Sequence, residues 1–173
     1  VKKSKGLGHR DNMRVCRLIL HRDGTLFVLI TGMRVPAGGP FTTKGVGLYR
    51  SRDGAGSWEL VNKTCLLLYP KDFAVDPADS RVIFIGACDA PIGMDQRVRN
   101  RQGGLHRTTD GGGAWTLVFT TTGPHVRSIV INPQREEVLY AATDDYNVYR
   151  STDSGFDIGD SGVREYRLSL IHI

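Results

Sequence analysis

Short runs of β-branched and aliphatic residues alternate with Gly, Pro and Asp along most of the chain. A typical unit is an apolar run at 71–76, a turn containing Pro77, and a second apolar run at 81–87. Runs of this length separated by turn residues are typical of antiparallel strands. Because helical periodicity is nowhere sustained, the pattern predicts an all-β fold.

One seven-residue pattern occurs three times, at 47–53, 104–110 and 147–153, and each copy ends in an aspartate. In the first two copies a tryptophan follows five positions after that aspartate. The three aspartates are 57 and 43 residues apart, which suits a four-stranded propeller blade. The sequence therefore predicts a β-propeller fragment of about three four-stranded antiparallel blades.

Each repeat is expected to supply strands A to D in chain order. Residues 13–62 are predicted to form blade one, 63–120 blade two and 121–158 a partial blade three. Residues 1–12 are expected to end a preceding blade, and 159–173 form a divergent tail, so further blades are expected on both sides. The predicted strands are 14–20, 25–31, 46–51 and 57–62 in blade one, 71–76, 81–87, 104–108 and 115–120 in blade two, and 126–132, 137–143 and 147–151 in blade three.

The two ends of the sequence look cut. The chain begins with Val1 rather than Met, and no leader segment is recognisable at the front. Residues 168–173 read like the translation of an adapter used in sequencing libraries, so we leave them out of fold reasoning. Native coding sequence running through those codons past Arg167 would contradict this hypothesis.

The repeated residues resemble the Asp-box, or bacterial neuraminidase repeat, pattern Ser/Thr-x-Asp-x-Gly-x-x-Trp. In such a turn a short carboxylate accepts hydrogen bonds from backbone N–H groups of its own hairpin. Because the aspartate recurs in every repeat, a structural role is expected rather than a catalytic one. Ala55 replaces the glycine of the first copy. The matching residues are Ser51, Asp53 and Trp58, then Thr108, Asp110, Gly112 and Trp115, and finally Ser151, Asp153 and Gly155.

The resemblance covers most of residues 13–157. Families with this repeat include sialidases, xyloglucan-cleaving endoglucanases, sortilin-type receptors and photosystem assembly factors. The resemblance implies a carbohydrate-active, glycoside hydrolase-like protein or, alternatively, a noncatalytic propeller for protein or glycan binding or assembly. It also favours a secreted or periplasmic location. The sialidase arginines do not align with this chain, and the sequence around the xyloglucanase catalytic aspartates is not recognisable in it.

Functional groups are expected at the end of the blades opposite the acidic turns. The B–C connections at 32–45 and 88–103 project there and are too long for simple hairpins. If the protein is a hydrolase, two carboxylates should face each other at about 5–5.5 Å for retention or about 6.5–9.5 Å for inversion. An ordinary polar surface is the alternative for each residue. The catalytic candidates are Asp89, Asp95, Asp144 and Asp145, with Asp89 or Asp95 facing Asp144 or Asp145; the binding candidates are Tyr69, Arg97, Arg99, His125, Arg127 and Tyr146; and Arg34, Lys44, Lys71, Asp72 and Gln96 share this face.

Composition removes other classes of function. The net charge of +5 is spread along the chain, without the basic stripe interleaved with aromatics of a nucleic-acid binder. Cys16, Cys65 and Cys88 lack the spacing of a metal site, and no cofactor motif is recognisable. No apolar run approaches the roughly 20 residues of a membrane span. The expected partners are a glycan or polysaccharide, a protein, and remaining blades of the same chain.

Overall fold

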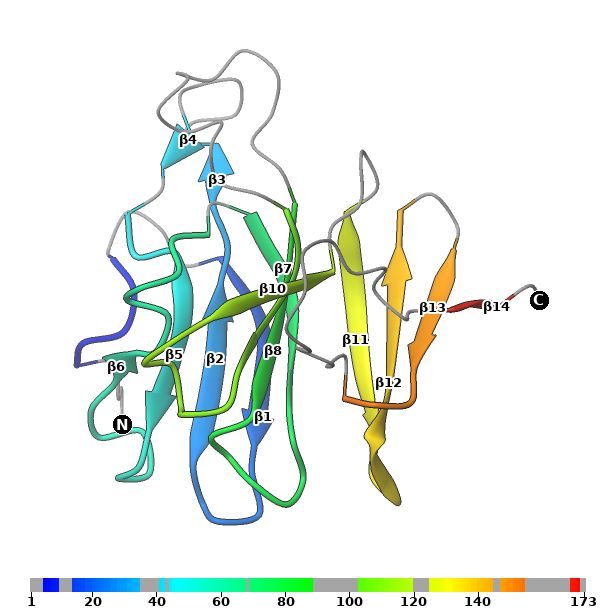
Figure 1. Ribbon diagram of the computed structural model, residues 1–173. Coiled ribbons are helices and arrows are strands. Elements are labelled where there is room, and N and C mark those ends of the chain that lie inside the picture. The colour runs from blue at the N-terminus through cyan, green and yellow to red at the C-terminus, as the bar shows by residue number, and fades with distance from the viewer. Residues whose placement is uncertain are drawn as a thin grey trace.

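The computed structural model describes residues 5–9, 14–34, 41–42, 44–67, 69–88, 103–119, 125–144, 147–154 and 169–171. These segments contain strands and no helix, so none of them includes a helix that could cross a bilayer. Three four-stranded antiparallel sheets stand side by side in chain order (Figure 1). The predicted all-β fold is confirmed, and the three sheets are blades of a β-propeller.

The strands follow the order expected for blades, with the first strand of each repeat innermost. A short separate ladder, β3 (Met33–Arg34) with β4 (Phe41–Thr42), lies in the connection between β2 and β5. Every predicted strand end lies within two residues of the observed one. Blade one consists of β1 (Val15–Leu20), β2 (Leu26–Ile30), β5 (Gly47–Ser51) and β6 (Glu59–Leu60), blade two of β7 (Tyr69–Val75), β8 (Ile83–Cys88), β9 (Gly104–Thr108) and β10 (Thr116–Phe119), and blade three of β11 (Val126–Asn132), β12 (Arg135–Thr143), β13 (Val148–Ser151) and β14 (Ser169–Ile171).

The outer strand of blade three differs from expectation. We left residues 168–173 out of the fold, but β14 pairs antiparallel with β13, with Leu170 opposite Tyr149. An edge strand needs backbone pairing with one neighbour only, so a short extended segment can occupy it without the tryptophan of the repeat. The adapter origin of this segment stays a prediction.

The described N-terminal segment, residues 5–9, lies against blade one. The backbone N–H of Trp58 donates to the Lys5 carbonyl oxygen at 2.9 Å, and Leu7 packs beside Trp58 and Leu60. The segment thus covers the outer part of one face of this blade. Its assignment to a preceding blade stays a prediction.

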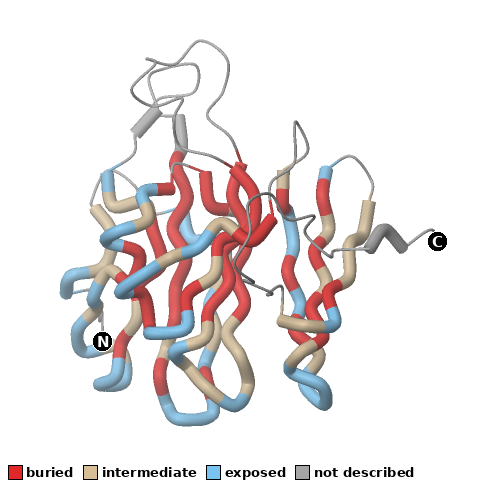
Figure 2. The backbone as a smooth tube through the Cα atoms, viewed as in Figure 1, coloured by how far each residue is buried: buried red, intermediate tan, exposed pale blue. Residues whose placement is uncertain are grey.

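Most of the core lies between the blades, and a smaller cluster lies between blade one and the N-terminal segment. We call the face that a blade turns toward the preceding repeat its leading face, and the opposite one its trailing face. Buried residues run along the strands, while many exposed residues lie in the turns (Figure 2). The trailing face of blade one (Phe27, Leu29, Leu48, Val61) packs on the leading face of blade two (Phe73, Ile83, Ile85, Ala87), and the trailing face of blade two (Ala74, Phe84, Leu105, Val118) packs on the leading face of blade three (Val126, Ile129, Ile131, Leu139, Ala141).

Each inner strand has a register shift at the same position. The shifts lie between Val15 and Arg17 in β1, Pro70 and Asp72 in β7, and Val126 and Ser128 in β11. The extra residues are therefore Cys16, Lys71 and Arg127. A bulge redirects the side chains around it, so the same end of all three inner strands departs from regular alternation.

Asp72 joins all three inner strands. Arg17 of β1 donates to both of its carboxylate oxygens at 2.8 and 2.9 Å. From the other side, the Ile129 backbone N–H of β11 donates to Oδ2 at 2.8 Å and the Ser128 hydroxyl donates to it at 3.3 Å. We expected Asp72 to be a group of the functional face, but it lies within β7 and is buried, so its carboxylate is used between blades.

Candidate functional site

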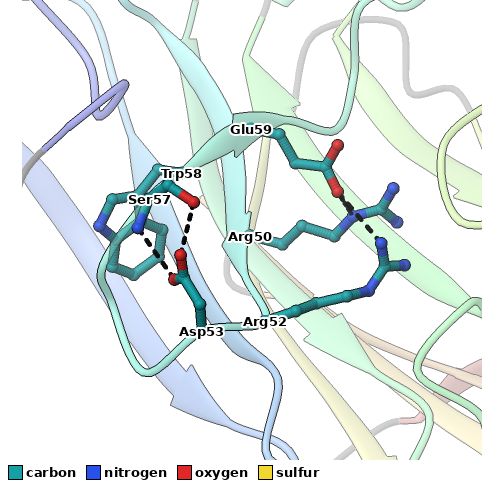
Figure 3. A pocket seen from close by; sticks show the side chains of 6 residues that line it. All are labelled: Arg50, Arg52, Asp53, Ser57, Trp58 and Glu59. Carbon is teal, nitrogen blue, oxygen red and sulfur yellow. Dashed lines mark hydrogen bonds and ion pairs between the residues drawn. The ribbon is translucent and has the colours of Figure 1, made fainter.

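The acidic turn of blade one is closed by Asp53 (Figure 3). Its Oδ1 accepts from the Ser51 hydroxyl at 2.7 Å and from the Ser57 backbone N–H at 2.9 Å, and its Oδ2 accepts from the Ser57 hydroxyl at 2.6 Å. The hydrogen bonds from Ser57, followed by that from Ser51, hold the pKa of Asp53 well below its ordinary value. The carboxylate is thus saturated by its own turn.

The turns of the next two blades repeat this geometry. Asp110 accepts from the Thr108 hydroxyl at 2.7 Å and from the Gly113 and Ala114 backbone N–H groups at 2.8 and 3.0 Å. The Thr108 and Ala114 bonds are the main cause of its lowered pKa. In blade three the Ser151 hydroxyl donates to Asp153 at 2.6 Å. Each aspartate therefore serves a separate hairpin on a separate blade.

A surface pocket of about 290 Å³ lies at the first acidic turn. Arg50 forms an ion pair with Glu59 and donates to the Gly111 carbonyl oxygen of blade two at 2.9 Å, and Arg52 also contacts Glu59, at 3.3 Å. These charges are satisfied within the protein and connect two blades. The pocket lining is Arg50, Arg52, Asp53, Ser57, Trp58 and Glu59 (Figure 3).

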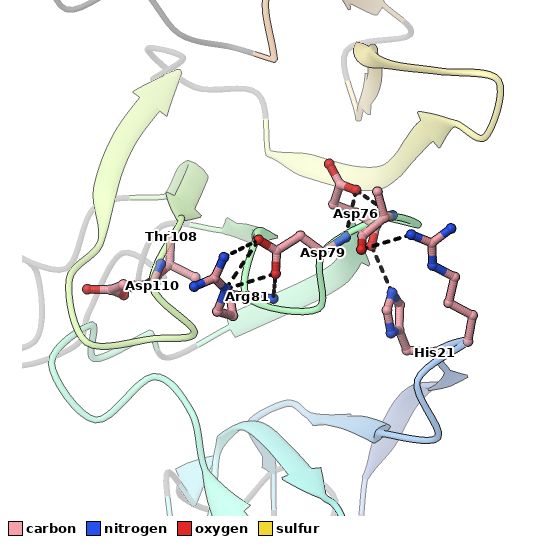
Figure 4. A network of polar contacts seen from close by, with 8 residues as sticks. His21, Asp76, Asp79, Arg81, Thr108 and Asp110 are labelled. Atoms are coloured by element: carbon pink, nitrogen blue, oxygen red, sulfur yellow. Dashed lines mark hydrogen bonds and ion pairs between the residues drawn. The ribbon is translucent and has the colours of Figure 1, made fainter.

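The first hairpins of blades one and two are also linked at this end (Figure 4). His21 Nε2 lies 3.0 Å from the Asp76 carbonyl oxygen, and Arg22 donates to the Ala78 carbonyl oxygen at 3.0 Å. Arg81 pairs with Asp79 at 2.8 Å. The polar groups of the turn end therefore hold the blades together, as the acidic turns do.

At the opposite end, three of the predicted candidates come together. The Asp144 carboxylate follows β12 and accepts from the His125 backbone N–H at 2.7 Å and from the Arg127 guanidinium at 2.9 and 3.1 Å. Asp144 N–H in turn donates to the His125 carbonyl oxygen at 3.2 Å. The His125 N–H, then Arg127, lower the pKa of Asp144, so this carboxylate is ionised at neutral pH.

Two further candidates lie at this end on the neighbouring inner strand. Tyr69 is the first residue of β7 and is buried, with 5% of its surface exposed. Lys71, the bulge residue, places its Nζ 5.8 Å from the centre of that ring. A cation over an aromatic face fixes the lysine side chain near the loop end of the strand.

The remaining candidates are distributed as follows. Within the described residues, no group of three or more His, Cys, Asp or Glu side chains is arranged to hold a metal ion. Arg34 lies in β3 and Lys44 in the turn before β5. Asp89, Asp95, Gln96, Arg97, Arg99, Asp145, Tyr146 and the turn residue Gly155 lie outside the described residues.

Sequence reasoning missed the bulge at Cys16 and the partnership of Arg17 with Asp72. The bulge residues are separated by 55 and 56 positions, a spacing that was present in the sequence. Spacing alone did not show that an extra residue is inserted there. The bulge near the loop end of each inner strand is therefore a repeated feature that the sequence motifs did not predict.

No protein-family model matches the sequence, and no curated protein matches it either. Solved structures of GH74 enzymes do resemble the fold. An ancestral GH74 enzyme has 20% identity and a TM-score of 0.57, with 89% of this chain and 21% of that chain covered. The Niastella koreensis GH74 enzyme has 23% identity and a TM-score of 0.58, with 84% of this chain and 22% of that chain covered. The GH74 xyloglucanase from Xanthomonas campestris has 18% identity and a TM-score of 0.57, with 88% of this chain and 23% of that chain covered.

These similarities define a class of fold: blades of the kind found in the propeller enzymes of GH74. At this identity the likeness concerns the fold alone. The chain spans about a fifth of the length of those enzymes.

Proposed function

We propose that this chain is part of a glycoside hydrolase-like propeller that binds a glycan at the loop end of its inner strands. The observation that carries the proposal is the repeated bulge, which brings Lys71 and Arg127 to the end where His125 and Asp144 also lie. Bulges are frequent beside functional sites because they redirect side chains. Charged hydrogen-bonding groups gathered at one end suit the many hydroxyl groups of a sugar.

The likeness to GH74 enzymes supports the carbohydrate part of this proposal. One of those structures is named a xyloglucanase, so xyloglucan is the first ligand to test. In the same proposal the hairpins closed by Asp53, Asp110 and Asp153 are Asp-box turns. Their carboxylates are then structural, since each is bonded within its own hairpin.

One observation favours binding without catalysis by the described residues. Glycoside hydrolysis needs a carboxyl group that is protonated when it acts as general acid. Asp144 is held ionised by His125 and Arg127, and the Asp72 carboxylate is bonded to Arg17 and to the backbone of β11. Of the predicted catalytic candidates, this leaves Asp89, Asp95 and Asp145, which lie outside the described residues.

Isothermal titration calorimetry with soluble xyloglucan tests the proposal. Wild type should bind xyloglucan. Arg127→Ala should weaken binding about tenfold or more, because the variant loses a charged hydrogen bond to the bound glycan. Arg135→Ala is the matched control, because Arg135 is an exposed arginine paired with Glu137 at the turn end. Equal affinity in both variants, or no binding of xyloglucan and other β-glucans, contradicts the proposal.

Release of reducing sugar separates hydrolysis from binding. If the described carboxylates only bind the glycan, wild type should release no reducing sugar at this site. Asp144→Asn should then lower the affinity for the glycan and also release no reducing sugar. Turnover by wild type that Asp144→Asn abolishes while affinity is retained would instead assign catalysis to Asp144.

A further inference from the structure

The residue after each bulge residue occupies an equivalent position in the three inner strands. Regular pairing with the second strand of the blade resumes at this residue in every blade. All three residues are polar or charged: Arg17 in β1, Asp72 in β7 and Ser128 in β11. The repeat thus places three hydrogen-bonding side chains in corresponding places on neighbouring blades.

These three side chains are bonded to one another through Asp72. Arg17 donates to both carboxylate oxygens, and the Ser128 hydroxyl donates to Oδ2 at 3.3 Å. The Ile129 backbone N–H adds a bond to Oδ2 at 2.8 Å. The Asp72 side chain is 8% exposed. One buried carboxylate therefore connects the positions that directly follow all three bulge residues.

Stability alone gives no reason for an acid at this position. The clusters between the blades consist of apolar side chains, and replacing a buried ion pair by apolar residues of similar volume is often neutral or stabilising. A buried polar network whose members are all bonded instead fixes one arrangement of the groups that share it. Asp72 therefore restricts how the bulged ends of the inner strands lie relative to one another.

Two of these bulge residues, Lys71 and Arg127, belong to the proposed glycan site, and each has a partner within its own blade. Lys71 Nζ lies 5.8 Å from the centre of the Tyr69 ring on the same strand. Arg127 pairs with Asp144 of blade three at 2.9 Å. These contacts orient each side chain on its own blade, but they do not set the distance between the two blades.

The Asp72 network provides that connection. Lys71 precedes Asp72 in the chain and Arg127 precedes Ser128, so each binding residue has its Cα about 3.8 Å from that of a network member. The bonds from Ser128 and Ile129 to the Asp72 carboxylate cross from blade three to blade two. They thus join the two binding residues across the boundary between the blades.

We propose that Asp72 is a positioning residue of the glycan site, whose carboxylate sets the spacing between Lys71 of blade two and Arg127 of blade three. This inference rests on the proposed function. A glycan that contacts both blades binds more tightly when the two cations are already held at the required spacing, because binding then costs less ordering. Asp72 itself is buried and acts on the glycan through these two neighbours.

Isothermal titration calorimetry with xyloglucan on Asp72→Asn tests this inference. The amide keeps the shape of the side chain and one acceptor oxygen, but it loses the second acceptor and the ion pair with Arg17. The affinity for xyloglucan should fall about tenfold. Asp79→Asn is the matched control, because Asp79 pairs with Arg81 at the turn end, and it should bind as wild type does. Circular dichroism at the assay temperature checks the fold of each variant.

A double-mutant cycle separates positioning from a general loss of stability. In the Asp72→Asn background, Arg127→Ala should weaken binding by less than about threefold, compared with about tenfold in the wild-type background, because the arginine is already displaced from the glycan. A residue that only stabilises the fold would leave the effect of Arg127→Ala unchanged.

Arg17→Ala serves as the second variant if Asp72→Asn does not fold, since it leaves the Asp72 bonds to β11 in place. Its affinity for xyloglucan should be about threefold lower, and Arg17→Lys, which retains a cation beside Asp72, should restore most of it. Wild-type affinity in the folded variant, or a full effect of Arg127→Ala in the Asp72→Asn background, overturns the inference and leaves glycan binding intact. If wild type does not bind xyloglucan, the proposed function fails and this inference fails with it.

Discussion

Ala55 is a strained residue in the first acidic turn. Its φ of 70° lies in the left-handed region, which costs an L-residue roughly 1–2 kcal/mol. The corresponding residue of the second turn is Gly112, with a φ of 103°, and a Cβ built there would lie 2.3 Å from the Val61 carbonyl oxygen. Glycine is thus favoured by conformation alone at the first position, and by conformation and space at the second.

Replacing Ala55 by glycine and Gly112 by alanine should change the free energy of unfolding in opposite directions. Ala55→Gly relieves the left-handed alanine and, after the extra entropy of glycine in the unfolded chain, should raise the free energy of unfolding by about 0.5–1 kcal/mol. Gly112→Ala should lower it by about 1–3 kcal/mol through backbone strain alone. Urea denaturation followed by tryptophan fluorescence measures both, and a destabilised Ala55→Gly variant would contradict the assigned strain.

The acidic turns should make stability depend on pH. Hydrogen bonds from Ser57 and Thr108 lower the folded-state pKa of Asp53 and Asp110, so their stabilisation is complete above the unfolded pKa of about 4 and is lost as pH falls below it. The thermal midpoint should therefore drop between about pH 5 and pH 2. Asp110→Asn should flatten that drop relative to wild type, because the variant has no carboxylate to protonate in the second turn.

At the scale of the elements, Asp72 connects the inner strands of all three blades by hydrogen bonds. Asp72→Ala leaves the Arg17 guanidinium and the buried Ile129 N–H without their acceptor, and should cost about 2–4 kcal/mol. Arg17→Ala should cost less, about 1 kcal/mol, because the Arg17 side chain is 39% exposed and Asp72 keeps its bonds to β11. Chemical denaturation measures both, and an equal or larger cost for Arg17→Ala would show that Asp72 acts through that pair alone.

The strands were predictable because apolar runs and turn residues are local signals, and the repeat confirmed each run with another. The bulges at Cys16, Lys71 and Arg127 were not, because an inserted residue leaves the composition of the run unchanged. The partners of Asp72 lie 55 to 57 residues away, so only the packing of the blades identifies them. β14 was missed because residues 168–173 had been set aside as the translation of an adapter.

At the scale of the whole molecule, topology predicted part of the candidate site. Antiparallel blades place the connections before β11 and after β12 at one end, which is why His125, Arg127 and Asp144 were expected together there. The sequence did not show that the Asp144 carboxylate would accept hydrogen bonds from both His125 and Arg127. Those bonds depend on the register of β11 against β12. A residue type can be placed at an end by topology, but its partners are set by register.

Uncovered blade faces should also govern how the whole chain melts. A monomer with an exposed leading face on blade one and trailing face on blade three lacks part of the burial that stabilises repeat proteins, so we expect it to unfold with low cooperativity. Differential scanning calorimetry measures this by comparing the calorimetric enthalpy of unfolding with the van't Hoff enthalpy. Equal enthalpies, the mark of cooperative melting of a soluble monomer, would contradict the incomplete burial.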